Sequence, residues 1–579
     1  MKIAANLARG DENRTLRYSD GHDPLDESVC NRANIDGSKV VWAREMDAEE
    51  NLEPIRDYGD RKVWLARAGA GQKEPQAGLL HGQHGAASVS TLSQIHKKIR
   101  SSWPEWMALT FYSALVAFAI PYHEPFADEA QAWQLARSLS LPTLFQSYVR
   151  YEASPGLWHF LLWILIRAHV SYTGLHWICG AIAVTATAVL VFKSPFPRYL
   201  KLTLPFTVFL LFQYAIVACS YVLVPSLLYL IALFWKRSPL VLALLLGLLA
   251  NVALHASVIS GGLALAYFIE QVRSGGIKDP RRMRPYLLGT LILCSLWAFA
   301  LWTAWPPKDN AFFTSYDHGN HSFLMSAFTS LLWGTCERPL LSIPFWIAIA
   351  VWFGARRKLF YLLPVLFFAA FSGFVLANWW HVGLLAPLLL CLLWITWPAP
   401  SGGVSRSEIL GRTALGVMIV GQILWAGYAI EYDHNNAYSP DLATAEFLRP
   451  LVEKGASIVV TYSDDPDGRG YRAVGILPYF DQNIFINLPE PFWSWSNRNP
   501  TEQMFMQVLP TNPAVVVVEV RSRHPELPVN LHGERIGLLY RDGYRFTHMF
   551  CGSMPIRFQP AEKSCHLIFQ RPDSPQDPP

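Results

Sequence analysis

Residues 105–133 read EWMALTFYSALVAFAIPYHEPFADEAQAW, and the rest of the chain is organised around this stretch. Its first half is an apolar run that ends near Pro121, and its second half is a polar segment that carries Asp128 and Glu129. An uncharged run of this length is typical of a helix that crosses a membrane. The stretch therefore predicts a membrane span whose far end delivers two carboxylates into the following loop.

Similar apolar runs of roughly 14 to 22 residues recur as far as Ile430, and a membrane span needs roughly 17 to 25. After the first run, they lie near 155–170, 174–192, 200–213, 214–235, 239–254, 255–271, 286–304, 340–355, 359–377, 381–397 and 411–430. We expect one of the runs within 155–192 to be short, tilted or re-entrant. The pattern predicts a polytopic α-helical membrane protein with about 11–13 transmembrane helices.

The basic residues predict how the chain is oriented. Residues 1–100 are polar and without periodicity, which predicts a disordered cytoplasmic tail, and no apolar h-region of a signal peptide is found at its start. The cluster at 96–100 (HKKIR) precedes the first span and marks the cytoplasmic side. The loop at 122–154 is then extracytoplasmic. The net charge is only +4 and lies in such loops, so we expect a lipid bilayer and no nucleic acid as partner.

The eight cysteines are scattered, without CxxC or Cys/His metal spacing. The sequence therefore predicts no metal site, and no motif predicts a cofactor. Only Cys551 and Cys565 lie together in a polar region that we place outside the cytoplasm, where a disulfide persists. Spacing alone leaves open whether they pair.

The composition changes after Ile430 to that of a soluble domain. Residues 436–579 predict a C-terminal extracytoplasmic α/β domain, which ends in a Pro-rich tail. We expect a helix at 440–453, strands at 457–462, 484–486 and 514–520, and a hairpin at 538–546 around Asp542-Gly543.

The loop at 122–154 carries the candidate chemistry. Transfer of a sugar from a phosphate leaving group needs a base for the acceptor hydroxyl, which a carboxylate with a tuned pKa supplies. Asp128 is our candidate base, with Glu129 as the second catalytic candidate. Cations must hold the departing phosphate, and arginine suits that geometry. The substrate-binding candidates of this loop are Arg137, Arg150 and Glu152. The alternative is that Asp128 only caps a helix at 129–139.

Residues 128–133 (DEAQAW) and 151–158 (YEASPGLW) together carry a resemblance. They look like the first extracytoplasmic loop of GT-C superfamily glycosyltransferases, and especially of bacterial proteins similar to glycosyltransferase family 39. That family includes protein O-mannosyltransferases and enzymes that add aminoarabinose to lipid A. The resemblance implies inverting transfer from a polyprenyl-phosphate-linked sugar, with Asp128 in the catalytic position. It also implies a bacterial cytoplasmic membrane and leaves a lipid, a glycan or a protein as the acceptor.

Weaker similarities extend over roughly residues 105–480. Residues 213–221 (QYAIVACSY) resemble a segment in which relatives usually have Glu at the position of Gln213 and Arg at that of Cys219. The chain departs from the family at both positions, which puts its donor site or its activity in doubt. Relatives commonly show Arg-His-x-Gly where this chain has Trp380-His381-x-Gly383, so we expect His381 to face a phosphate, or to be incidental to an aromatic anchor at the interface.

Four further groups carry alternatives. His255, four residues after Asn251 on one helix face, contacts substrate or bonds to another helix. Lys308 neutralises the donor phosphate or snorkels at the interface. Asp317, His318 and His321 form a polar loop or, less in keeping with their spacing, a metal site. Trp493 and Trp495 stack on a sugar or pack as ordinary aromatics.

Two other function classes remain open. A lipid-linked saccharide transporter or flippase is expected to show internal repeats and helices broken at mid-membrane. The sequence has no convincing repeat, and its polar residues gather at one face, which favours the enzyme. A degenerate, non-catalytic relative is the other alternative, because of Gln213 and Cys219.

Overall fold

The chain divides into two compact units, Met1–Trp103 and Pro104–Pro579. The computed structural model describes residues 14–17, 40–42, 62–67, 76–80, 102–152, 154–275, 280–310, 322–375, 379–398, 404–462, 473–489, 502–522, 533–555 and 561–572. In the first unit these are the strands β1 (Arg14–Arg17), β2 (Val40–Trp42), β3 (Lys62–Arg67) and β4 (Gln76–Leu80), in the order β2-β1-β3-β4. Apart from these strands, residues 1–100 lie outside the described residues, and the prediction that they are disordered is not tested there.

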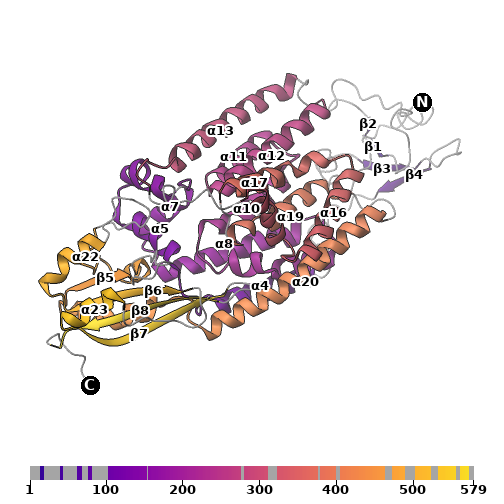
Figure 1. Ribbon diagram of the computed structural model, residues 1–579. Helices are drawn as coiled ribbons and strands as arrows, with labels where there is room; N and C mark the ends of the chain where they lie inside the picture. Colours follow the sequence, from indigo (N-terminus) through magenta and orange to yellow (C-terminus); the bar gives the residue numbers. More distant parts are fainter. Residues whose placement is uncertain are drawn as a thin grey trace. The chain divides into compact units, whose positions relative to one another are not determined.

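The second unit is mostly helical, with a small sheet near its C-terminus (Figure 1). Its helices up to residue 435 are α4 (Trp103–Ala119), α5 (Ala127–Ser138), α6 (Leu141–Thr143), η1 (Leu144–Tyr148), η2 (Val149–Glu152), α7 (Leu157–Arg167), α8 (Tyr172–Lys193), α9 (Arg198–Thr203), η3 (Leu204–Phe206), η4 (Phe209–Gln213), η5 (Ser220–Val222), α10 (Leu223–Phe234), α11 (Pro239–Ala250), α12 (Leu254–Arg273), α13 (Pro280–Ala304), α15 (Phe323–Trp333), α16 (Pro339–Ala355), η7 (Leu359–Leu362), α17 (Leu363–Phe374), α18 (Trp379–Val382), α19 (Leu385–Thr396) and α20 (Arg406–Asn435).

Three helices in the described part of the chain are long and apolar enough to cross a membrane, namely Tyr172–Lys193, Met283–Ala304 and Arg406–Asn435. The other apolar helices are shorter. Helix α7 has 11 residues, which at about 1.5 Å per residue is well short of a bilayer core of about 30 Å. This agrees with the expectation of a short run within 155–192.

The predicted run at 200–213 does not form one helix. It is divided into α9, the 3-10 helix η3 and the π-helix η4, and the chain then continues irregularly to η5. Pro205 lies in the 3-10 segment, where it lacks the N–H that would continue an α-helix. Helix α15, in contrast, was not among the predicted runs.

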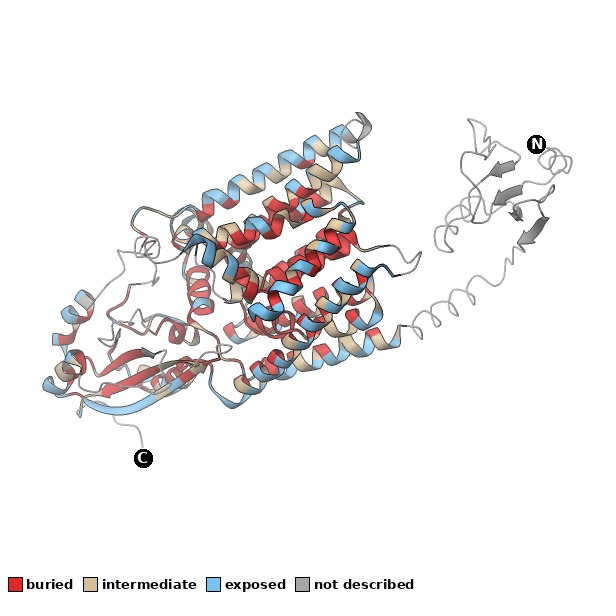
Figure 2. Ribbon diagram, turned by 45° about the vertical axis from the view of Figure 1, so that its right-hand side comes forward, coloured by how far each residue is buried: buried red, intermediate tan, exposed pale blue. Residues whose placement is uncertain are grey.

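The outer helices expose leucine side chains. On α13, Leu287 and Leu291 are each 63% exposed, whereas the inner helix α19 is buried along its whole length. Figure 2 shows this contrast as pale-blue outer faces around a red interior. The helical part therefore has an apolar exterior as well as an apolar core, which water-soluble monomers rarely show over so large an area.

Small and hydroxyl-bearing residues let the inner helices approach closely. A Cβ atom at Gly262 of α12 would lie 2.5 Å from Cα of Pro364 in α17. Ser260 of α12 donates a hydrogen bond to the carbonyl of Leu246 in α11 at 2.7 Å. The stretch Ser260-Gly261-Gly262 therefore serves close helix packing.

The C-terminal sheet has the strand order β5-β6-β8-β7. Its strands are β5 (Ile458–Tyr462), β6 (Val515–Ser522), β7 (Arg545–Met554) and β8 (Glu562–Gln570), and its helices are α21 (Asp441–Glu453), η8 (Val474–Tyr479), α22 (Glu502–Val508), η9 (Leu509–Thr511) and α23 (Glu534–Arg541). Strand β5 is parallel to β6, and the other pairs are antiparallel. Cys551 and Cys565 are paired opposite each other on β7 and β8 and form a disulfide.

Two details of the predicted domain are wrong. Residues 538–541 belong to helix α23, so the expected hairpin is a helix, a turn and a strand, with Gly543 at φ 84° in the turn. Ile536 and Leu539 are buried at helical spacing, and this period of three prevails over the local strand propensity. Residues 484–486 form no strand, and Phe485 makes only an isolated bridge to Ile458.

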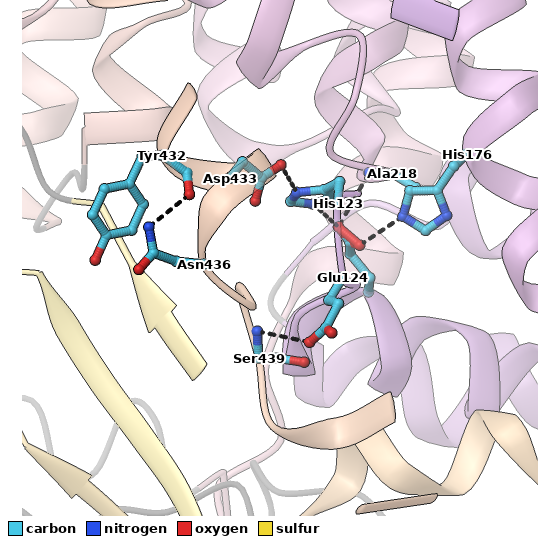
Figure 3. Close-up of polar contacts among 9 residues, drawn as sticks. His123, Glu124, His176, Ala218, Tyr432, Asp433, Asn436 and Ser439 are labelled. Carbon is cyan, nitrogen blue, oxygen red and sulfur yellow. Dashed lines mark hydrogen bonds and ion pairs between the residues drawn. The ribbon is translucent and has the colours of Figure 1, made fainter. Parts of the chain in front are cut away.

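Hydrogen bonds between described residues join the sheet domain to the helical part. Gln134 of α5 donates to the carbonyl of Val474 at 3.2 Å, and the hydroxyls of Tyr432 and Ser553 are 2.6 Å apart. The backbone N–H of Ser439 donates to the Glu124 carboxylate at 3.3 Å (Figure 3). The loop after α4 therefore lies between the apolar helices and the C-terminal domain.

Candidate functional site

Helix α5 begins at Ala127, and its N-cap residue is Phe126. The alternative that Asp128 caps the helix is therefore wrong, because Asp128 already lies in the first turn. There its negative charge interacts favourably with the helix dipole. The two neighbouring carboxylates have different surroundings, since Asp128 is exposed and Glu129 is buried. Only Asp128 is placed to meet a molecule from outside.

Glu129 binds three other elements. It accepts a hydrogen bond from the backbone N–H of Ala218 at 3.1 Å, and it lies 3.3 Å from Nε2 of His176 on α8. Its Oε1 is 3.8 Å from Nε2 of His123, in the turn between α4 and α5. Figure 3 shows His123, His176 and Ala218 converging from separate segments of the chain. Glu129 thus anchors the first turn of α5, from which the side chain of Asp128 is exposed.

His123 faces a second carboxylate. Its Nδ1 is 3.0 Å from Oδ2 of Asp433, near the end of α20 (Figure 3). Burial by itself lowers the pKa of His123, but Asp433 and Glu129 outweigh it, so the net pKa is raised. Burial likewise acts to raise the pKa of Glu129, but the nearby rings of His123 and His176 reverse this, so the net pKa is lowered. The lowered pKa of the buried Glu129 therefore depends on the two histidines beside it.

The remaining candidates of the first loop bind protein groups. Arg137 donates to the carbonyl of Phe480 in the C-terminal domain, and Glu152 accepts from the side chain of Gln131. Arg150 donates to the carbonyl of Trp305 at 3.0 Å. The contacts of Arg137 and Glu152 help to hold the loop in place. Arg150 links the loop to the segment that carries Lys308.

The segment after α13 packs on the first loop. The side chain of Asn310 donates to the carbonyl of Tyr151 at 2.8 Å, and the Tyr151 hydroxyl donates to Asp309 at 2.9 Å. Lys308, next to Asp309, is exposed. The structure therefore brings the segment of Lys308 to the loop of Asp128. Asp317, His318 and His321 lie outside the described residues, as do Trp493 and Trp495.

His255 and His381 come together from α12 and α18. Their rings are stacked at an angle of 12°, with centroids 4.4 Å apart. The ring of Tyr221 lies 5.6 Å from that of His381. Asp128 in turn acts electrostatically on the side chain of Tyr221. The histidine pair, Tyr221 and Asp128 therefore belong to one region, although they come from positions between 128 and 381 in the sequence.

Residues 213–222 connect the two parts of this region. The Tyr214 hydroxyl donates to the carbonyl of Trp380 at 2.6 Å, next to His381. Ala218 binds Glu129 at the other end, as described above. The two positions that depart from the family pattern lie within this connection: Gln213 is buried, and Cys219 is half-buried beside Asp128 and Glu129.

The sequence analysis missed His176 and Asp433, and it quoted His123 without giving it a role. All three are polar residues in or next to apolar helices, a pattern that by itself indicates function. Comparisons with known protein families, with curated proteins and with solved structures find no match for this chain.

Proposed function

We propose that this chain is an integral membrane glycosyltransferase of the GT-C type, which transfers a sugar from a polyprenyl-phosphate donor to an extracytoplasmic acceptor. The observation that carries the proposal is the exposed Asp128 in the first turn of α5. The neighbouring Glu129 is buried and anchors this turn. It follows the first apolar helix directly. The C-terminal domain contacts the same helix through Gln134.

A membrane location is supported by the three long apolar helices and by the exposed leucines of the helical part. We place the N-terminus in the cytoplasm and the C-terminal domain outside, in a bacterial cytoplasmic membrane. A lipid-linked donor follows from that side of the membrane, because soluble nucleotide sugars are confined to the cytoplasm. The disulfide between Cys551 and Cys565 is in keeping with an oxidising compartment.

The proposed reaction is a single displacement. Asp128 takes the proton from the acceptor hydroxyl while the acceptor oxygen bonds to the anomeric carbon of the donor. The bond from that carbon to the phosphate oxygen breaks, and polyprenyl phosphate leaves with the electron pair. The configuration at the anomeric carbon is inverted. Arg150, Lys308 and the histidine pair supply the cationic and hydrogen-bonding groups for the departing phosphate.

The test uses the full chain in lipid vesicles, labelled polyprenyl-phosphate sugars, and lipid, glycan and protein acceptors. We compare the parent with Asp128→Asn and with the matched control Glu431→Gln, an exposed acid on α20. The parent and the control are expected to transfer label, and Asp128→Asn to lose at least about 100-fold in rate. Undiminished transfer by a folded Asp128→Asn protein contradicts the assignment of the base.

One observation favours the transporter as the second candidate. The segment from η3 to η5 is a broken and mostly buried helical run, a feature of transporter binding sites. The same vesicles separate the two: movement of lipid-linked sugar between leaflets without transfer supports the transporter. The absence of both activities supports a degenerate relative.

A further inference from the structure

We infer that His123, Glu129 and His176 form a binding site for one zinc ion. The inference is independent of the proposed glycosyl transfer, because it rests on the cluster alone. The possible ligand atoms of the three residues all lie within 4.8 Å of one another, and all three residues are buried. They come from the turn before α5, from α5 itself and from α8.

The distances from the two histidines to the two oxygens of Glu129 are near those between ligands of a tetrahedral ion. Zinc binds histidine nitrogen and carboxylate oxygen at about 2.0–2.1 Å, so two ligand atoms at the tetrahedral angle are about 3.3 Å apart. Nε2 of His176 is 3.3 Å from Oε2 of Glu129, and Nε2 of His123 is 3.8 Å from Oε1. Two histidines and one glutamate are also a ligand set that zinc enzymes use, with the fourth position left for water or substrate.

The surroundings of His123 leave its Nε2 available to bind a metal. Its Nδ1 is hydrogen-bonded to Oδ2 of Asp433, which places the proton of a neutral ring on Nδ1. The lone pair of Nε2 then points to Glu129 and His176. This buried Nε2 has no hydrogen-bond partner. A carboxylate behind a metal-binding histidine is the arrangement that orients the ring and raises its basicity in zinc sites.

The charges require a cation at this place. Glu129 and Asp433 bring two negative charges into a region where the side chains of His123, Glu129 and Asp433 are at most 3% exposed. Buried carboxylates must be compensated, and one divalent ion with neutral histidines balances both.

The ligand types select zinc among the common ions. Magnesium and calcium prefer oxygen ligands in larger number, and two imidazoles exclude them in favour of transition metals. Non-haem iron uses the same three residue types but keeps several open positions. Here protein surrounds the ligands on all sides, which favours four-coordinate zinc. The ion would tie α5 to α8 and, through Asp433, to α20, and so fix the position of Asp128.

The experiment measures metal content of the purified full chain in detergent, prepared through a tag without histidine. We expect about one zinc per chain in the parent and a background level in His176→Ala. The matched control is His159→Ala, which removes a buried histidine of the neighbouring helix α7. It is expected to keep the zinc. Zinc that persists in His176→Ala, or its absence from both parent and control, overturns the inference.

A second measurement does not depend on whether a protein with a substituted metal ligand folds. The parent is stripped with a chelator and titrated with Co²⁺, which is expected to bind one per chain with the visible spectrum of a tetrahedral site. Asp433→Asn is expected to weaken this binding roughly 10- to 100-fold, because it removes the second carboxylate and not a ligand. Lack of saturable binding overturns the site, and one iron per chain overturns its assignment to zinc. None of these readouts requires sugar transfer, so their failure is distinguishable from failure of the proposed function.

Discussion

The Glu129 carboxylate accepts a hydrogen bond from the backbone N–H of Ala218 at 3.1 Å. This bond joins the first turn of α5 to the irregular segment between η4 and η5. The two adjacent acids differ in burial. Glu129, which makes this bond, is buried, whereas the side chain of Asp128 is exposed. Substitutions at these two positions should consequently affect different properties.

Glu129→Gln is expected to destabilise the protein. The change removes the buried negative charge that lies between His123 and His176, and breaking a buried charge pair in this way typically costs about 3–5 kcal/mol. Thermal unfolding in detergent measures the effect, with Glu431→Gln as the exposed control. Asp128→Asn is expected to unfold like the parent. A larger loss of stability in Asp128→Asn than in Glu129→Gln would contradict these roles.

His381→Ala is expected to weaken donor binding, if the proposed function holds. A hydrogen bond to a charged phosphate contributes about 1.5–3 kcal/mol, which corresponds to roughly a 10- to 100-fold loss in kcat/KM for the donor. His159→Ala is the control, because that buried histidine lies outside the stacked pair. Steady-state kinetics with varied donor concentration measure kcat/KM for the parent and both variants. Equal effects of both changes would show that His381 serves only packing.

The disulfide between Cys551 and Cys565 should stabilise the C-terminal domain. The cysteines are 14 residues apart, and a loop of that length corresponds to about 3 kcal/mol in the chain-entropy account. We expect the double substitution to serine to lower the unfolding temperature and to abolish its dependence on reductant. A control at the free, exposed Cys294 should change neither. Mass spectrometry of the unreduced protein tests the bond directly.

The stability of the C-terminal domain should depend on pH. Burial, assisted by Glu519, raises the pKa of Asp441 to about 8, and burial lowers the pKa of His566 to about 3. The contribution of Asp441 is full below its unfolded pKa of about 4 and is lost as pH rises through about 8. That of His566 is full above about 6.5 and is lost as pH falls toward 3.

The two contributions oppose each other between about pH 4 and 6.5, so stability is expected to change little there. Above 6.5 only Asp441 acts, and stability should fall by at most about 1.4 kcal/mol per pH unit. Thermal unfolding between pH 5 and pH 8.5 tests this. Asp441→Asn should flatten the fall, whereas Asp542→Asn, an exposed control, should retain it.

Gly262→Ala is expected to destabilise the helical part. The added Cβ meets Cα of Pro364 at 2.5 Å, which is backbone and can move only with α17. Such overpacking typically costs about 1–3 kcal/mol. Gly416→Ala makes the same change in α20 where nothing lies within 4 Å, and it should be neutral or stabilising. Unfolding temperatures that fall equally in both variants would contradict close packing at Gly262.

Apolar periodicity predicted much of the helical architecture. Helices α8, α12 and α20 lie where long apolar runs predicted them, and α21, β5 and β6 lie close to their predicted bounds. The failures have local causes. The run at 200–213 is apolar enough for a helix, but tertiary contacts and Pro205 impose short 3-10 and π segments. Hydrophobicity carries no information on such a break.

The site was less predictable than the fold. Asp128 and Glu129 were found because they are adjacent and follow an apolar run. The sequence could not show that one is exposed and the other buried. His176 is 47 residues from Glu129, and Asp433 is 310 residues from His123, so no spacing rule relates these pairs. Arg137 and Glu152 were predicted from charge to bind substrate, but both contact protein groups in the structure.

The segment around residues 214–218 also bears on how the sequence can drift during evolution. Its link to Glu129 uses a backbone amide, and its link to α18 ends on a backbone carbonyl. Neither link depends on the side chain at position 213 or 219. Substitutions at those two positions can therefore accumulate during evolution while both links, and with them the placement of α5 and α18, are retained.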